Sequence, residues 1–369
     1  MKFIELFAGI GGFRLGLERT GHECIWTNEF EQIPRGIYEY NFKEKPDERD
    51  IRTIPGRDVP DADLIVGGFP CATFSLAGKR TGFSLEDTRG TLCFEMFRIA
   101  HEKQIPYIMF ENVKGLLSHD SGKTFAVILT VLDELGYDCQ WDLLDSQSFG
   151  IPQHRERIFV IGHLRGQPRP KIFPLGETSE SPRTEIRNKR TGEQIIRGEN
   201  KNDTTERDRE YVVKMFEFGT LREYKSRGFP TLLASMGTGS ENIPLLFPRD
   251  RSVKEKLLSQ TSFSSLLMNE GSLNKNIDGS LRTRSNVREI TPLECERLQG
   301  LPDDWTKHRI VDGKIELTRQ KDRYERCGRT VTIPVIEAIG KKLGRSWYDK
   351  PKDSISETNK SSGENNRKQ

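Results

Sequence analysis

Short apolar runs alternate with amphipathic stretches from residue 2 to about residue 163, and this alternation constrains the fold more than any other feature. The strand-like apolar runs are 3–7, 24–28, 64–67, 107–111, 138–145 and 157–162. The helix-like stretches between them are 13–20, 32–40, 91–101 and 124–135. Such alternation is typical of a parallel sheet covered by helices, in which ligands gather outside the carboxyl ends of the strands. We therefore expect an α/β fold whose functional residues follow the strands.

The rest of the chain divides into three parts. After residue 163, Pro, Gly and charged residues follow no clear period, which favours a second, smaller and irregular domain. Regular patterning returns at Thr291, where Pro292 and Glu294 complete a helix-start signal, and a last amphipathic helix is expected over 333–343. The polar tail is expected to be disordered. The predicted division of the chain is 1–163, 164–287, 288–348 and 349–369.

Bulk composition excludes several classes of protein. The 58 Lys and Arg against 55 Asp and Glu leave a net charge of +3, too little for a purely electrostatic nucleic-acid coat. Basic residues do crowd between 183 and 227, where they could face phosphates or form a solvated surface. The six cysteines are scattered without a C-x-x-C pair, which argues against a metal site or disulfides. Without a signal peptide or membrane-spanning run, we expect a soluble, cytoplasmic protein.

A glycine-rich turn joins the first strand to the first helix. Residues 7–12 read FAGIGG, a bare backbone that a nucleotide-like cofactor can approach, although such a turn also suits a dehydrogenase or simple chain reversal. The third glycine of a pyrophosphate-binding pattern is displaced, which favours a cofactor whose anion is a single carboxylate. Glu29 closes the second strand, where it can hold ribose hydroxyls or favour a helix N-terminus.

The segment after the third strand carries the most specific signal. Residues 67–75 read GGFPCATFS. A single cysteine is usually a small buried hydrophobe. Cys71, however, follows Pro70 at a strand end and leads into a flexible loop with Lys79 and Arg80, which suits an exposed nucleophile. The two cations could lower the pKa of the thiol and contact phosphate.

Two more strand ends carry charged side chains. Glu111 ends the next strand, and neighbouring parallel strands would bring it to the same sheet edge as Cys71. A carboxyl group there could cap a loop, or burial could keep it protonated and able to donate. Arg155 and Arg157 lie at the start of the last strand and should point the same way, toward carbonyl or phosphate oxygens or into surface ion pairs.

In this order, these elements resemble the DNA cytosine-5 methyltransferase family of the bacterial modification type. The resemblance covers residues 3–162 almost without gaps, the segment 288–302 (REITPLECERLQGLP) and the run Gly328-Arg329-Thr330-Val331. It implies a Rossmann-like sheet that binds S-adenosylmethionine and places a target-recognition domain at 164–287. It further implies a monomer that acts on double-stranded DNA, with or without a paired restriction endonuclease.

The resemblance also implies roles for individual residues. The catalytic residues would be Cys71, Glu111, Arg155 and Arg157. The cofactor-binding residues would be Phe7, Ala8, Gly9, Ile10, Gly11, Gly12, Glu29, Phe30, Asp50, Ile51, Pro70, Leu92 and Thr330. The DNA-binding residues would be Lys79, Arg80, Arg89, Arg227 and Thr231.

The residue types suit methyl transfer to carbon. Cytosine C5 is a weak nucleophile, and a thiolate that adds at C6 with proton donation at N3 converts the ring to a reactive enamine. The target base must first leave the duplex. The sequence departs from the family at Ala72, where Gln is usual, at His154, where Lys or Arg is commoner, and at Arg329, which replaces Asn.

Three other functions are compatible with parts of the pattern. A tRNA cytosine-5 methyltransferase would share the core, but the long basic insert favours a reader of duplex DNA. A non-catalytic DNA-binding regulator would not need Cys71, Glu111 and the two arginines together. A nicotinamide dehydrogenase would explain the first glycines alone.

Overall fold

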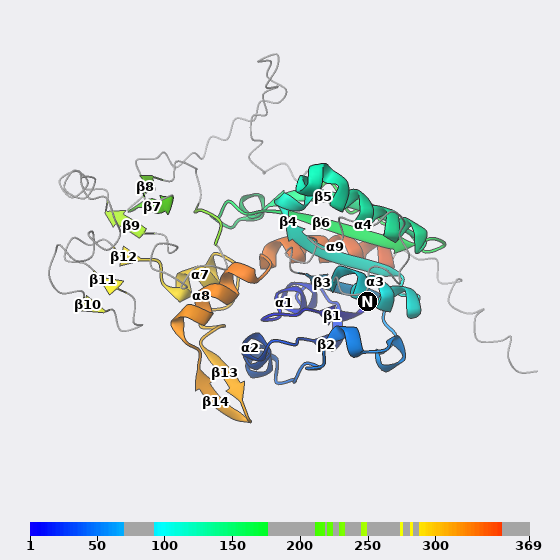
Figure 1. The fold of residues 1–369 in the computed structure, drawn as a ribbon, viewed down its shortest axis with the longest axis horizontal. Coiled ribbons are helices and arrows are strands. Elements are labelled where there is room, and N and C mark those ends of the chain that lie inside the picture. The colour runs from blue at the N-terminus through cyan, green and yellow to red at the C-terminus, as the bar shows by residue number, and fades with distance from the viewer. Residues whose placement is uncertain are drawn as a thin grey trace, which may run out of the picture.

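The computed structural model describes residues 1–69, 92–175, 211–217, 220–223, 229–232, 245–248, 274–275, 281–282 and 288–348. Its centre is a six-stranded sheet with the order β2-β1-β3-β4-β6-β5 (Figure 1). The strands are β1 (Lys2–Leu6), β2 (Glu23–Asn28), β3 (Leu64–Gly68), β4 (Tyr107–Val113), β5 (Tyr137–Asp145) and β6 (Glu156–Leu164). All six strands expected from the sequence are present, each within two residues of its predicted ends. The α/β prediction is confirmed.

The parallel pattern expected from the sequence holds for the first four strands but not for the last one. β1, β2, β3 and β4 are mutually parallel where they pair, but β6 lies antiparallel to both β4 and β5. The reason is the short connection between β5 and β6, which contains only the 3-10 turn Ser146–Phe149 and a loop. A parallel crossover needs a dozen or more residues, usually with a helix, so the chain turns back on itself instead.

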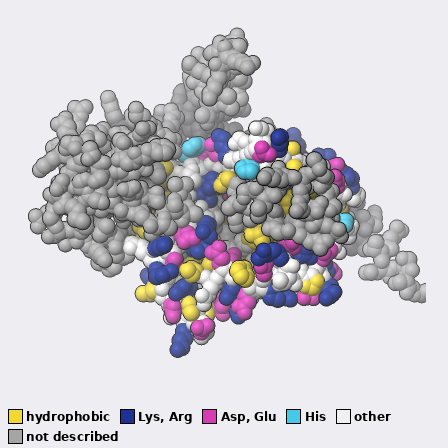
Figure 2. Space-filling model, viewed as in Figure 1, with side chains coloured by type: hydrophobic (Ala, Val, Ile, Leu, Met, Phe, Trp, Pro, Cys, Tyr) yellow, Lys and Arg dark blue, Asp and Glu magenta, His cyan; other side chains and the backbone are white. Residues whose placement is uncertain are grey.

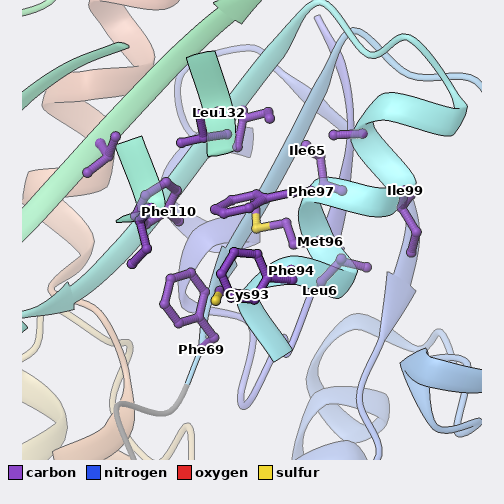
Figure 3. Close-up of a cluster of buried hydrophobic side chains, with 14 of the residues drawn as sticks. Leu6, Ile65, Phe69, Cys93, Phe94, Met96, Phe97, Ile99, Phe110 and Leu132 are labelled. Carbon is purple, nitrogen blue, oxygen red and sulfur yellow. The ribbon is translucent and has the colours of Figure 1, made fainter. Parts of the chain in front are cut away.

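Helices cover both faces of the sheet. One face packs against α3 (Leu92–Glu102) and α4 (Lys123–Glu134), and the other packs against α1 (Gly12–Glu18) and α9 (Ile333–Tyr348). Figure 3 shows the first of these layers, where Phe94 and Phe97 of α3 meet Phe69, which follows β3, and Phe110 of β4. Full burial of one such side chain contributes about 1.5–3 kcal/mol. This packing holds the strand ends that carry the site.

The segment 288–348 returns to the first domain. Helix α7 (Pro292–Arg297) begins with the predicted capping box: the Thr291 hydroxyl accepts from the Glu294 amide, and the Glu294 carboxylate accepts from the Thr291 amide. The hairpin of β13 (His308–Val311) and β14 (Lys314–Leu317), and helix α8 (Gln320–Arg329), were not predicted. The hairpin does have a sequence signal, because Asp312 and Gly313 both adopt the positive φ that an Asp-Gly turn favours.

Described strands between residues 211 and 289 form a second, antiparallel sheet. Its strand order is β10-β11-β12-β9-β7-β8. The strands are β7 (Tyr211–Glu217), β8 (Thr220–Glu223), β9 (Leu245–Pro248), β10 (Asn274–Lys275), β11 (Leu281–Arg282) and β12 (Arg288–Glu289). The domain boundaries stay a prediction, and the tail 349–369 lies outside the described residues. Over the described surface in Figure 2, basic and acidic side chains are interspersed, in keeping with the small net charge.

Candidate active site

A cavity of about 270 Å³ opens beyond the carboxyl ends of β1, β2 and β3. Helix α2 (Gln32–Phe42) and the end of α8 border it. The residues expected to bind the cofactor that line this cavity are Phe7, Ala8, Gly9, Ile10, Gly12, Glu29, Phe30, Asp50, Ile51, Leu92 and Thr330. Gly11 lies behind the cavity wall, and Pro70 lies outside the described residues. The structure thus gathers residues from five separate parts of the sequence around one space.

The glycine-rich turn is held from behind by aromatic side chains. Gly11 has a φ of 83°, and a Cβ atom there would overlap the ring of Phe42. The indole nitrogen of Trp305, from the C-terminal segment, donates to the Ile10 carbonyl at 2.9 Å, and its ring packs on Phe42. Phe7 also adopts a positive φ of 53°, which is strained for a side chain of this size. The sequence predicted the turn but not Trp305, which follows it by almost 300 residues.

Glu29 joins the turn to the start of α2. Its two carboxylate oxygens accept from the amides of Gly9 and Glu31, each at 2.7 Å. Burial raises the pKa of the Glu29 carboxyl, although the two amide donors oppose this effect. A carboxylate accepts about four hydrogen bonds, so Glu29 retains capacity for hydroxyl groups in the cavity.

Asp50 lies at another side of the cavity, where it caps the short turn Ile51–Thr53. Its side chain accepts from the Arg52 amide at 3.0 Å and forms an ion pair with the Arg52 guanidinium. This pair lowers the pKa of the Asp50 carboxyl. Asp50 is therefore an acceptor at the cavity rim, next to the buried Ile51.

Glu111 lies where the cavity meets the end of β4. It is 9% exposed and is the register partner of Gly68 on β3. Its Oε1 atom is 3.1 Å from Nε of Arg157. Burial raises the pKa of the Glu111 carboxyl, and Arg157 and Arg155 oppose that shift. A carboxyl group in this setting can retain a proton and donate it.

Cys71 lies outside the described residues, as do Lys79, Arg80, Arg89 and Arg227. The chain leading to it is placed, because Gly68 ends β3 beside Glu111 and the Asn112 amide donates to the Phe69 carbonyl at 3.0 Å. Asn112 was not singled out from the sequence, although it directly follows Glu111. It fixes the main chain two residues before Cys71.

Arg157 of β6 and Arg155, which directly precedes that strand, have different surroundings. Arg157 contacts Glu111, whereas Arg155 is buried and donates to the carbonyls of Leu232, Gly328 and Thr330 at 2.8–3.2 Å. Burial lowers the pKa of Arg155 to about 9. Arg155 therefore braces three segments that are distant in sequence, a role its pattern did not reveal.

Residues next to Arg155 hold the described segment 229–232. The Thr231 hydroxyl donates to the His154 carbonyl at 2.6 Å, and the His154 imidazole lies 2.5 Å from the Asp145 carboxylate. The Gln153 side chain accepts from the Leu232 amide and donates to the Leu298 carbonyl. Thr231, expected to contact DNA, is thus tied to the catalytic sheet by its hydroxyl.

Within the part of the chain that the structure describes, no cluster of three or more metal-ligating side chains occurs. Among the described helices, none has the length and apolar character to cross a membrane.

The sheet, the glycine turn after β1 and the acid after β2 define a Rossmann-like methyltransferase. Residues 1–345 match the family model for C-5 cytosine-specific DNA methylases, and the chain belongs to that family. It is therefore a DNA cytosine-5 methyltransferase, and its methyl donor is S-adenosylmethionine. The prediction from the sequence motifs is confirmed at this level.

Similar proteins cover almost the whole chain. The chain is 33% identical to the type II methyltransferase M.Bsp6I of Bacillus sp. (strain RFL6), over 94% of this chain and 99% of that protein. It is 32% identical to the type II methyltransferase M.HhaI of Haemophilus parahaemolyticus, over 95% and 96%. The solved DNMT2 of Spodoptera frugiperda shares the fold with a TM-score of 0.61 at 18% identity, over 93% of this chain and 99% of that one.

Proposed function

We propose that this protein methylates a cytosine that has swung out of a specific double-stranded DNA sequence, through a covalent bond between Cys71 and C6. The observation that carries the proposal is the position of Glu111. This buried carboxyl group lies opposite Gly68, three residues before Cys71, and borders the cavity. An acid and a thiol that approach one ring from adjacent strand ends can act on N3 and C6 together.

The proposed reaction proceeds in balanced steps. The Cys71 thiolate forms a bond to C6 while the Glu111 carboxyl transfers its proton to N3, which makes C5 an enamine carbon. S-adenosylmethionine, when bound, would supply the methyl group to C5, and its methyl–sulfur bond would break to leave S-adenosylhomocysteine. A base then removes the C5 proton, the S–C6 bond breaks, and N3 returns its proton to Glu111. This sequence replaces one difficult displacement with easier steps.

Arg157 and Arg155 divide two tasks in this proposal. Arg157, 3.1 Å from Glu111, holds the carboxyl in place and can stabilise charge on the cytosine O2 atom. Arg155 fixes the β6 end against Leu232 and Thr330 through its three carbonyl contacts. Removal of either guanidinium would leave buried groups without partners.

The cavity residues would hold the cofactor by its separate parts. Phe7 would lie against the adenine and Glu29 would bind the ribose hydroxyls. Asp50 and Ile51 would contact the adenine edge. The main chain of residues 8–12 would hold the amino-acid end. The free acceptor capacity of Glu29 and the rim position of Asp50 support this arrangement.

The region 164–287 would read the DNA. Extrusion of a base costs a few kcal/mol of stacking and pairing, which contacts from both domains would offset. Phosphate contacts by Lys79, Arg80, Arg89 and Arg227 would make affinity fall steeply with salt. The type II relatives support a role as the modification partner of a restriction endonuclease, with a monomer sufficient for one target.

Two measurements test the covalent mechanism. Cys71→Ser should abolish methyl transfer while leaving S-adenosylmethionine binding near normal, because a hydroxyl is too weak an acid for the addition. DNA with 5-fluorocytosine at the target should form a persistent adduct with the native enzyme, visible in a denaturing gel, since fluorine cannot leave as a cation. Methyl transfer by the serine variant, or the absence of an adduct at a site that is otherwise methylated, would contradict the proposal.

A further inference from the structure

The rim of the cofactor cavity carries ion pairs that the proposed mechanism does not use. Glu31, at the start of α2, bridges two arginines from the last turns of α8. Its Oε2 atom is 2.6 Å from Arg326 Nη1, and its Oε1 atom is 3.2 Å from Arg329 Nη1. All three side chains line the cavity. The bridge therefore links the two walls of the cavity across nearly 300 residues of sequence.

One carboxylate oxygen meets each guanidinium, and this is how a ligand carboxylate can bind between two arginines. The three side chains differ in their freedom to move. Arg326 is buried, with its side chain 9% exposed, and Glu325 contacts both guanidinium groups, at 3.3 Å for Arg326 and 2.8 Å for Arg329. The Glu31 side chain is 51% exposed. The Arg329 side chain is also half-exposed, at 50%, so what holds both arginines in place is Glu325, and Glu31 can turn outward into solvent while these contacts remain.

The positive charges that line the cavity indicate the same place for a ligand carboxylate, between Arg326 and Arg329. Among the described residues, the remaining cation that lines the cavity is Arg52, and its guanidinium is paired with Asp50. Arg329 immediately precedes Thr330, whose hydroxyl lies against Gly12 at the end of the glycine turn. The two bridged arginines therefore lie where the α8–α9 junction meets the turn proposed to hold the amino-acid end of the donor.

We propose that Arg326 and Arg329 bind the carboxylate of S-adenosylmethionine, and that this carboxylate displaces Glu31 from them. The inference rests on the proposed placement of the donor in this cavity. Exchange of one carboxylate for another leaves the charge beside the guanidinium groups unchanged, so neither arginine is left unpaired in either state. A donor that lacks the carboxylate cannot replace Glu31, and the site selects against it.

The test compares two ligands by isothermal titration calorimetry with the full chain. One is S-adenosylmethionine, and the other is decarboxylated S-adenosylmethionine, which lacks only the carboxylate. Arg329→Met should lower the affinity for S-adenosylmethionine about ten- to a hundredfold, as expected for the loss of a charge-assisted hydrogen bond. It should change the affinity for the decarboxylated ligand less than about threefold. Arg319→Met is the matched control, because Arg319 pairs with Asp322 at the other end of α8 and does not line the cavity. It should change neither affinity.

Glu31→Ala gives the opposite prediction. Without its competitor, S-adenosylmethionine should bind several-fold more tightly, and its preference over the decarboxylated ligand should increase. Thermal melting of each variant reports whether it is folded. If Arg329→Met does not fold, Arg329→Gln replaces it in the same titrations.

Three other results would contradict the proposed carboxylate site, the displacement of Glu31 or the cofactor cavity. If Arg329→Met lowers the affinity for both ligands equally, Arg329 has only a structural role. If it lowers neither affinity, the carboxylate binds elsewhere. An unchanged or smaller preference in Glu31→Ala would refute the displacement. If the native chain binds neither ligand, the proposed cofactor cavity itself fails, which is a distinct result.

Discussion

The site has two halves along the carboxyl edge of the sheet. Beside β1 and β2, hydrogen bonds to backbone groups hold the chain, whereas beside β4 and β6 buried charged side chains hold it. The glycine turn is fixed by the Trp305 contact to the Ile10 carbonyl and by the acceptor oxygens of Glu29. The other end is fixed by the Glu111–Arg157 pair and by Arg155. The first end should therefore respond to changes of shape, and the second to changes of charge and protonation.

Among changes at these two ends, the largest effect should come from removing the proton of Glu111. Glu111→Gln keeps the size of the side chain but cannot transfer a proton to N3, so methyl transfer should slow by about 10²–10⁴-fold. S-adenosylmethionine binding, measured by calorimetry, should change little. The exposed carboxylate of Glu134 at the end of α4 provides the control, Glu134→Gln. If both variants turn over at comparable rates, Glu111 is not the acid that protonates N3.

The pH dependence of the native enzyme also tests whether protonated Glu111 is the acid. Because burial raises the pKa of Glu111, the carboxyl is protonated at low pH and loses its proton as the pH passes upward through that value. Single-turnover methyl transfer should therefore decline on the alkaline side, measured at constant ionic strength. Because formation of the Cys71 thiolate raises the rate with pH, the control is Glu111→Gln, whose residual activity should lack the alkaline decline. A decline that persists in that variant would contradict the assignment.

Glu5 tests whether the stability of the β1 end also depends on the protonation of a buried carboxyl group. This residue of β1 is fully buried, and burial raises its pKa from 4.5 to about 8. Between those pH values the folded state binds more protons than the unfolded state, so stability should fall as pH rises, by up to about 1.4 kcal/mol per pH unit. Glu5→Gln should remove this slope in urea unfolding measured at pH 5.5 and 7.5, whereas the exposed Glu23→Gln should keep it. Parallel slopes for Glu5→Gln and the native chain would show that Glu5 is ionised.

Gly11→Ala probes the shape of the turn. The added Cβ would overlap Phe42, whose ring is confined by Trp305, Tyr38 and Arg14, and φ is positive. Overpacking of this kind costs about 1–3 kcal/mol, in addition to the left-handed strain. The control is Gly21→Ala, which has a similar φ of 86° but open space around the added atom. Donor affinity should fall only in Gly11→Ala, and equal stability losses in the two variants would refute the packing argument.

The smallest effect should come from Trp305→Phe. Phenylalanine keeps an aromatic ring beside Phe42 but loses the donor to the Ile10 carbonyl, which should cost about 1 kcal/mol. The KM for S-adenosylmethionine should rise while the KM for DNA stays constant. Trp141→Phe, at a half-exposed position on β5, should change neither constant. A change in both constants would mean that Trp305 acts on the whole domain rather than on the turn.

The sequence by itself determined the elements and their chemistry. Local periodicity and caps are short-range properties, so the strands and main helices of residues 1–163 and the capping box at Thr291 could be predicted, whereas the β13–β14 hairpin and α8 were not. Consecutive motifs also predicted which residue types follow each strand. The antiparallel β6 was missed because strand direction depends on the connection that returns the chain, not on the pattern within the strand.

Only the tertiary structure decided which distant residues meet. Trp305 at Ile10, Arg155 at Thr330, and Glu31 between Arg326 and Arg329 are contacts over more than 150 residues of sequence. Such pairs leave no periodic signal, because a single hydrogen bond or ion pair depends on how whole elements pack. The strand ends defined where chemistry occurs, and the packing of the C-terminal segment onto them formed the wall of the cavity.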